Sequence, residues 1–185
     1  MNKELKSKLL PITLALVVIV LDQITKMLVV RYIPLYKTGF HLFGDFLRFI
    51  HVANTGVAFS VGAGWSQLSR WLLFCIVPLI VIIIVFIVYF KNTEWSKLQR
   101  WSIMGIIGGG LGNLIDRFFR AEGVVDFIDF KWFGFAKSPI NFFRMERWPT
   151  FNIADAAVVV CALTLGISFI IANYKESKNQ KSEKK

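Results

Sequence analysis

Histidine and cysteine are both scarce in this chain, with two of each among 185 residues. Metal centres built from these side chains need several ligands at short spacings. His41 and His51 have no clustered partners, and the HExxH pattern of zinc peptidases is absent. Cys75 and Cys161 lie far apart with no CxxC spacing, which predicts buried packing residues. We therefore expect neither a metal nor a cofactor.

Two other catalytic signatures are also missing. The sequence has no phosphate-cradling loop, and no Ser lies in a nucleophile elbow. Acidic residues are few, 12 against 22 basic ones, so the net charge is +10. The excess positive charge lies largely in the terminal tails, which is typical of segments that set the orientation in a membrane and contact anionic lipids. We expect no nucleic-acid partner.

Hydrophobic residues are abundant, at 55% of the chain, and they fall in four long runs. Each run approaches the about 20 residues that cross about 30 Å of hydrocarbon. The first is too long for a signal peptide and ends in no small-residue cleavage site, so it counts as a span. The sequence predicts an all-α membrane protein with transmembrane helices at 9–30, 71–90, 101–119 and 153–173. We expect a single domain over 1–174 and a basic, disordered tail over 175–185.

The density of Lys and Arg predicts the orientation. Both tails and the 91–100 loop together carry eleven of the 22 basic residues, whereas the two longer loops spread nine over more sequence. By the positive-inside rule, both termini and the 91–100 loop are cytoplasmic. Segments 31–70 and 120–150 then face outward.

The two outward segments differ in composition. Phe46 to Val52 mixes aromatic and β-branched residues and is followed by turn residues, which favours short strands on the outer surface. The second segment places aromatics beside basic residues, as in an interfacial loop at headgroup level. Such a loop either clamps a lipid-borne substrate or forms an ordinary aromatic belt. Its aromatics are Phe127, Phe130, Trp132, Phe133, Phe135, Phe142, Phe143 and Trp148.

Four Asp residues lie in or beside the apolar runs, where an ionised side chain is costly and marks a candidate functional site. Asp22 and Lys26 stand at i and i+4, which favours a structural ion pair. Asp116 shares a helical face with Asn113 and Arg117, and we expect Arg117 to neutralise it within a structural cluster. Glycines at 105 and 109, and at 108 and 112, have the spacing that allows close helix approach.

The other two, Asp126 and Asp155, are expected at the outer interface, at opposite ends of neighbouring helices. Two carboxylates in a dry site share a proton, so one can activate water while the other polarises a carbonyl. This is aspartyl peptidase chemistry. A competing explanation makes Asp155 part of a capping box with Asn152 at the N-cap. Both can hold, and the helix dipole would then leave Asp126 as the usual proton carrier.

A polar turn precedes the second span. Asn54 followed by Gly56 is typical of a surface turn, and the same amide could also hydrogen-bond a peptide backbone.

Five motifs in order resemble those of bacterial lipoprotein signal peptidase, or signal peptidase II. They are Leu21-Asp22-Gln-x-x-Lys26, Asn54-x-Gly-x-Ala-Phe59, Gly112-Asn-x-x-Asp-Arg117, Val125-Asp-Phe127 and Phe151-Asn-x-Ala-Asp155. The similarity covers about residues 10 to 172. It implies an inner-membrane aspartyl endopeptidase that removes signal peptides from prolipoproteins. Cleavage would fall just before a diacylglyceryl-modified cysteine, at the outer face of the membrane.

The resemblance also implies roles for single residues, in an enzyme expected to act as a monomer. The catalytic pair is Asp126 and Asp155, while Asp22, Lys26 and Asp116 support the fold. Two intervals are longer than the family pattern: one leaves Asp129 as an alternative to Asp126, and the other is a loop insertion between Lys131 and Trp148. The residues implied to contact substrate or hold the pair are Asn54, Gly56, Asn113, Arg117 and Asn152.

Two functions from other classes remain open on the residues alone. A proton-coupled transporter would relay protons through Asp22, Asp116 and Asp155, yet three of the four acids are expected near the outer edge instead of along a path. A membrane adaptor would use its Asp residues only to pair helices. It would tolerate Asp126→Asn and Asp155→Asn singly.

Overall fold

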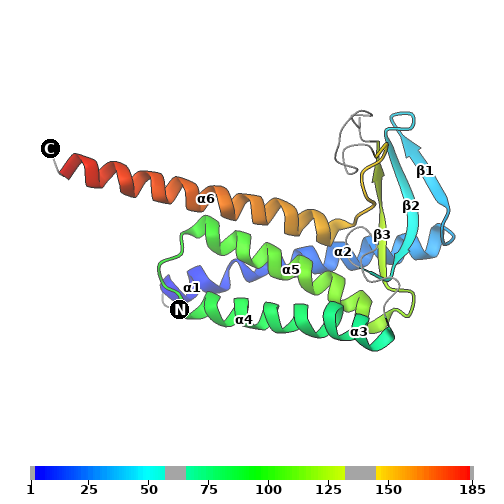
Figure 1. The fold of residues 1–185 in the computed structure, drawn as a ribbon, viewed down its shortest axis with the longest axis horizontal. Helices are drawn as coiled ribbons and strands as arrows, with labels where there is room; N and C mark the ends of the chain where they lie inside the picture. Colours follow the sequence, from blue (N-terminus) through cyan, green and yellow to red (C-terminus); the bar gives the residue numbers. More distant parts are fainter. Residues whose placement is uncertain (1–2, 57–65, 132–144, 184–185) are drawn as a thin grey trace.

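The structure, a computed structural model, describes residues 3–56, 66–131 and 145–183. Helices lie side by side along one long axis, with a small sheet at one end and both chain termini at the other (Figure 1). The helical segments are α1 (Lys3–Leu9), α2 (Ile12–Tyr32), α3 (Gln67–Trp71), a π-helical turn (Leu72–Ile76), α4 (Val77–Lys91), α5 (Lys97–Phe119) and α6 (Ile153–Glu183).

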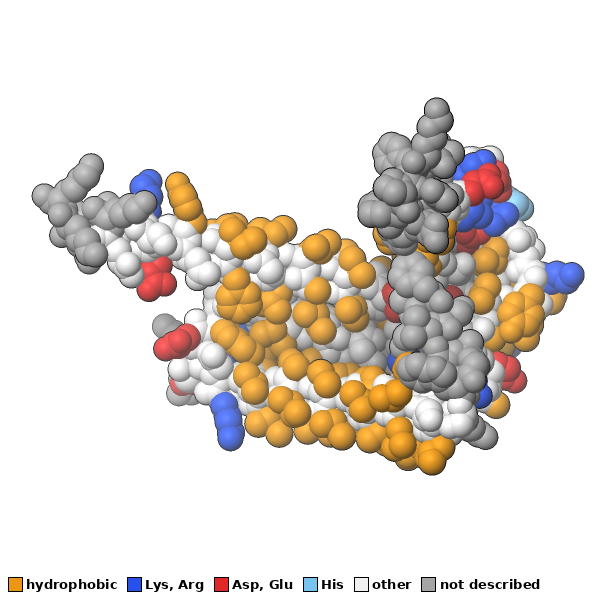
Figure 2. All heavy atoms as spheres, viewed as in Figure 1, with side chains coloured by type: hydrophobic (Ala, Val, Ile, Leu, Met, Phe, Trp, Pro, Cys, Tyr) orange, Lys and Arg blue, Asp and Glu red, His pale blue; other side chains and the backbone are white. Residues whose placement is uncertain are grey.

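Three helices in the described part of the chain are long and apolar enough to cross a membrane: Glu4–Tyr32, Leu68–Lys91 and Ile153–Gln180. Their exposed apolar side chains cover the helical part of the molecule, and charged side chains gather toward its two ends (Figure 2). The chain is therefore a mostly helical membrane protein, as the apolar runs predict. Its last helix continues to Glu183, so the tail predicted to be disordered is helical up to that residue.

The helix α5 is the centre of the bundle, since it packs against α2, α4 and α6. Two of its glycines explain the close packing. A Cβ added at Gly108 would lie 2.7 Å from the Cα of Ala15 in α2, and one at Gly109 would overlap the carbonyl oxygen of Ala154 in α6. The predicted close helix approach is confirmed, because backbone lies where side chains would otherwise stand.

We expect Gly109→Ala to destabilise the protein by about 1–3 kcal/mol, because overpacking forces α5 and α6 apart. Gly110→Ala is the matched control, since its Cβ would meet only the flexible side chain of Ile82. Both changes add the same methyl group to neighbouring positions of one helix. Unfolding followed in detergent measures the difference, and equal stability of the two variants would contradict this account of the packing.

The sheet contains β1 (Thr38–Leu42), β2 (Leu47–Asn54) and β3 (Val124–Phe130), antiparallel and in the order β1-β2-β3. The strands predicted between 31 and 70 are confirmed. The strand β3 was not predicted, because the aromatic content of this segment favoured an interfacial loop. The run of β-branched and aromatic side chains from Val124 to Phe130, interrupted only by Asp126 and Asp129, is the signal that could have revealed it.

The strand β3 packs on the end of α2. Val125 and Phe127 form a buried cluster with Val29 and Ile33, so Phe127 is a core residue and no part of an interfacial loop. This contact anchors the sheet to the helical bundle and sets the depth of β3. Trp132, Phe133, Phe135, Phe142 and Phe143 of the predicted loop lie outside the described residues.

Candidate active site

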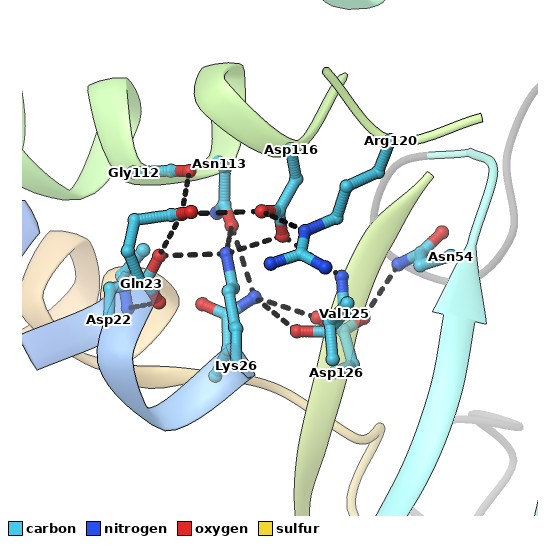
Figure 3. A network of polar contacts seen from close by, with 12 residues as sticks. Asp22, Gln23, Lys26, Asn54, Gly112, Asn113, Asp116, Arg120, Val125 and Asp126 are labelled. Atoms are coloured by element: carbon cyan, nitrogen blue, oxygen red, sulfur yellow. Dashed lines mark hydrogen bonds and ion pairs between the residues drawn. The ribbon is translucent and has the colours of Figure 1, made fainter. Parts of the chain in front are cut away.

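A buried ion cluster joins α2 to α5 (Figure 3). The ammonium group of Lys26 lies 2.8 Å from a carboxylate oxygen of Asp22 and 2.9 Å from one of Asp116, and all three side chains are 0% exposed. Its third donor reaches the amide oxygen of Asn113 at 2.9 Å. The predicted pair of Asp22 and Lys26 is therefore confirmed, as one side of a larger cluster.

Asp116 has further partners, and the prediction that Arg117 neutralises it is wrong. Arg120 donates to Asp116 at 2.9 Å, and so does the backbone N–H of Val125 at 3.1 Å (Figure 3). The reason is helical geometry: residue i+4 lies over residue i, whereas the next residue points about 100° away. Asp116 thus holds the start of β3 against α5, one residue before Asp126.

Arg117 instead contacts backbone carbonyls. Its guanidinium donates to the carbonyl of Phe74 at 3.2 Å and lies 3.5 Å from that of Gly56. These contacts tie the end of α5 to the π-helical turn and to the chain just after β2.

The carboxylate of Asp126 accepts two amide hydrogen bonds. Asn54 donates to one oxygen at 2.9 Å and Asn152 to the other at 2.7 Å. The side-chain oxygen of Asn54 also accepts from the backbone N–H of Gly56 at 3.0 Å. The turn expected at Asn54 and the contact implied by the resemblance are therefore both present, and the turn aims the Asn54 amide at Asp126.

Asp155 lies in the first turn of α6, where the predicted capping box is confirmed. Its carboxylate accepts from the backbone N–H of Asn152 at 3.1 Å, and its own N–H donates to the side-chain oxygen of Asn152 at 2.9 Å. The other carboxylate oxygen accepts from the amide of Asn113 at 2.7 Å.

Two asparagines connect the acids. The side-chain nitrogen of Asn152, which donates to Asp126, also donates to the oxygen of Asn113 at 3.0 Å, and Asn113 in turn donates to Asp155. Because Lys26 also donates to that Asn113 oxygen, the amide has only one consistent orientation. The two carboxylates therefore belong to one ordered network that begins at the buried ion cluster.

Both acids line a single cavity of about 640 Å³ between β3, the chain leading into α6, and α6 itself. Trp148 stacks on Phe130 at one wall, with ring centroids 5.8 Å apart and planes 11° apart. The remaining lining residues are Asn54, Asn113, Arg117, Val124, Pro149, Thr150, Phe151, Ala156, Val158, Val159 and Val160. A polar floor beneath apolar walls can hold a peptide bond next to a hydrophobic group.

The environment of Asp126 alters its acidity. Burial raises the pKa of its carboxyl group to about 7, and the negative charge of Asp155 adds to that effect. The hydrogen bonds from Asn54 and Asn152 oppose it by favouring the ionised form. Near neutral pH, Asp126 therefore exchanges a proton readily, as one member of a carboxyl pair must.

Asp129, the alternative to Asp126, lies in a different environment. Arg48 donates to it at 2.6 Å and Arg147 at 2.8 Å, and it does not line the cavity. Strand alternation explains this, because residues three apart point to opposite faces. In the described part of the chain, no group of three or more His, Cys, Asp or Glu is arranged to hold a metal ion.

The chain matches the family model described as signal peptidase (SPase) II over residues 14–171. It belongs to the signal peptidase II family. The lipoprotein signal peptidase of Treponema pallidum is 48% identical, covering 96% of this chain and 91% of the relative. The lipoprotein signal peptidase of Treponema denticola is 46% identical, covering 96% of this chain and 98% of the relative. That of Borrelia hermsii is 40% identical, covering 90% of this chain and 90% of the relative.

Solved structures share the fold of this chain. A bacterial membrane enzyme determined in meso has a TM-score of 0.70 and 27% identity, covering 91% of this chain and 90% of that one. The chain is thus a multi-pass membrane enzyme, an aspartic peptidase of the signal peptidase II type.

Two polar residues of this network, Gln23 and Arg120, have no role in the predictions made from the sequence. Gln23 donates to Asp22, to the carbonyl of Gly112 and to Asp116, at 3.0–3.2 Å. Gln23 stands in the first motif, but its position there predicts no contact, because two of its three partners, Gly112 and Asp116, come from another helix. Arg120 could have been found, since it stands at i+4 from Asp116.

Proposed function

We propose that this enzyme removes signal peptides from diacylglyceryl-modified prolipoproteins, with Asp126 and Asp155 as its catalytic pair. The observation that carries the proposal is the cavity, where a carboxylate from β3 and one from α6 belong to one amide network. The relatives that share up to 48% of the sequence are named lipoprotein signal peptidases, which supports the substrate class. The apolar walls suit a substrate that carries a lipid beside the scissile bond.

The mechanism follows from the two acids. Protonated Asp126 donates a hydrogen bond to the scissile carbonyl, and ionised Asp155 takes a proton from water, which attacks that carbon. The tetrahedral intermediate collapses as a proton passes to the leaving amine, and the pair is left sharing one proton again. Asn54, Asn113 and Asn152 hold the carboxylates in place, and Arg117 and Gly56 border the path of the substrate.

The same proposal includes the placement in the membrane. The helix α5 is also a span, which brings the number of spans to four. Its 23 residues reach about 34 Å, and three other helices surround it. Both termini are then cytoplasmic in a bacterial inner membrane, and the sheet and the two acids lie at the extracytoplasmic face. Residues 1–174 act as one unit, as a monomer, and need no cofactor.

The direct test uses purified protein in detergent with a chelator present. We expect cleavage of a diacylglyceryl-modified prolipoprotein and none of the unmodified precursor. The cleavage position is read by mass spectrometry and should fall just before the lipidated cysteine. Folded protein that cleaves neither substrate would favour the transporter or adaptor function instead.

Activity should fall as the pH rises above about 7, because ionisation of Asp126 removes the proton that polarises the carbonyl. Asn54→Ala should move this alkaline limb to higher pH, since the hydrogen bond it deletes favours the ionised form. Thr55→Ala is the control, as Thr55 is the exposed neighbour in the same turn. A pH series of kcat/KM measures both, and an unmoved limb in Asn54→Ala would contradict the assignment of the proton.

A further inference from the structure

A second hollow, of about 410 Å³, adjoins the active-site cavity and shares Asn54 and Arg117 with it. Three arginines line it: Arg70 from α3, and Arg117 and Arg120 from the end of α5. None of its lining residues in the described part of the chain is acidic. The other lining residues are Thr55, Trp71, Phe74, Cys75, Phe118, Ala121 and Gly123.

The three arginines of this hollow differ in how their charges are balanced, and Arg70 forms no ion pair with a carboxylate of the described residues. Lys26 and Arg120 balance the two buried carboxylates of Asp22 and Asp116, so they contribute no excess charge. Arg117 donates to carbonyl oxygens, and the carboxylates of Asp126 and Asp155 in the adjoining cavity stabilise its charge. The Nε of Arg70 is buried with no hydrogen-bond partner among the described residues. Leaving such a donor unsatisfied is costly, and a ligand that drew the Arg70 guanidinium into the hollow would relieve that cost.

The surroundings indicate which acceptor fits. Arg70 stands near the start of the span Leu68–Lys91, at the end of the molecule that carries the sheet, where a span meets the headgroups. Trp71 beside it is half exposed, as aromatic residues at that depth usually are. Guanidinium groups match phosphate oxygens in geometry and charge. The combination of arginines and apolar walls suits a phosphate group that is attached to a lipid.

We propose that this hollow binds a phosphate group, supplied in the membrane by an anionic glycerophospholipid, through Arg70 and Arg117. The proposal rests on the membrane placement given above and is independent of the peptidase reaction. Since Arg117 and Asn54 also line the active-site cavity, a bound headgroup would lie directly beside the substrate path. The enzyme would then process its lipidated substrate next to a bound bilayer lipid.

The test measures binding by titration calorimetry in a phosphate-free maltoside detergent. The probes are dihexanoylphosphatidylglycerol, inorganic phosphate and dihexanoylglycerol, which shares the acyl chains and lacks phosphate. We expect the phospholipid to bind and dihexanoylglycerol not to. Tighter binding of the phospholipid than of inorganic phosphate identifies a lipid headgroup as the ligand, whereas equal affinity identifies the free anion.

The variants are Arg70→Gln, which removes the charge, and Arg70→Lys, which keeps it. Arg31→Gln is the control, because Arg31 is an exposed cation at the same end of the molecule and outside the hollow. Arg70→Gln should weaken binding at least about tenfold, as expected for one charge-assisted hydrogen bond, and Arg70→Lys less. Thermal unfolding verifies that each variant is folded.

Two results would overturn the site: no phospholipid binding by wild type, or equal binding by wild type and folded Arg70→Gln. Cleavage by wild type in the same detergent separates the two proposals. Cleavage without phospholipid binding removes only the headgroup site. Binding without cleavage removes only the peptidase function.

Discussion

Asp126→Asn and Asp155→Asn should each lower cleavage of a diacylglyceryl-modified prolipoprotein by roughly 10²- to 10⁴-fold. An amide has nearly the size of a carboxyl group, and its single oxygen retains one of the two hydrogen bonds that each carboxylate accepts. It cannot pass a proton between water and the leaving amine. The loss should therefore fall on kcat, while folding is retained.

The matched control is Asp129→Asn, an identical change three residues along the same strand. Asp129 is held by Arg48 and Arg147 away from the cavity, so this variant should keep wild-type kcat in its folded fraction. Rates are measured by single-turnover cleavage, and folding by thermal unfolding. Near-normal cleavage by Asp126→Asn would restore Asp129 as the alternative. Near-normal cleavage by both catalytic variants would indicate a structural role, as in the adaptor function.

Lys26→Met should destabilise the protein by about 3–5 kcal/mol, because it leaves buried carboxylates without their shared cation. Among the described residues, Asp22 would lose its ion-pair partner, and Asp116 would keep Arg120 as its one cationic partner. Asn113 would also lose the donor that orients its amide toward Asp155. The variant should therefore lose activity even under conditions where it remains folded.

Lys97→Met provides the control, since it removes the same group from an exposed position in the first turn of α5. Its stability should match that of wild type. The triple variant Lys26→Met, Asp22→Asn, Asp116→Asn should recover part of the loss, because no uncompensated charge stays buried. Chemical unfolding in detergent measures all three. If Lys26→Met unfolded like Lys97→Met, the cluster would contribute nothing to the fold.

Local patterns predicted the parts of the site that depend on local geometry. The pair of Asp22 and Lys26 follows from i,i+4 spacing, and the capping box of Asn152 and Asp155 from its three-residue interval. The same helical rule, applied to Asp116, would have selected Arg120 in place of Arg117. The error came from weighing sequence adjacency above position on the helix surface.

Distant contacts could not be predicted in this way. The reach of Asn54 to Asp126 depends on the register of β2 against β3, where Asn54 lies opposite Val124. The strand β3 could not be predicted either, because an aromatic segment beside a membrane is equally compatible with an interfacial loop. Val125 and Phe127 become core residues only through packing against α2.

The sequence by itself determined where the apolar helices lie, which acids are candidates, and the local pairs, because hydropathy and helical periodicity are properties of neighbouring residues. The motif order also determined the family. Only the tertiary structure decided that Lys26 serves two carboxylates, and that Asn113 and Asn152 join Asp126 to Asp155. It also brought Arg70 to the hollow that Arg117 and Arg120 line. These contacts join residues far apart in the chain, and the packing of whole helices against the sheet sets their distances.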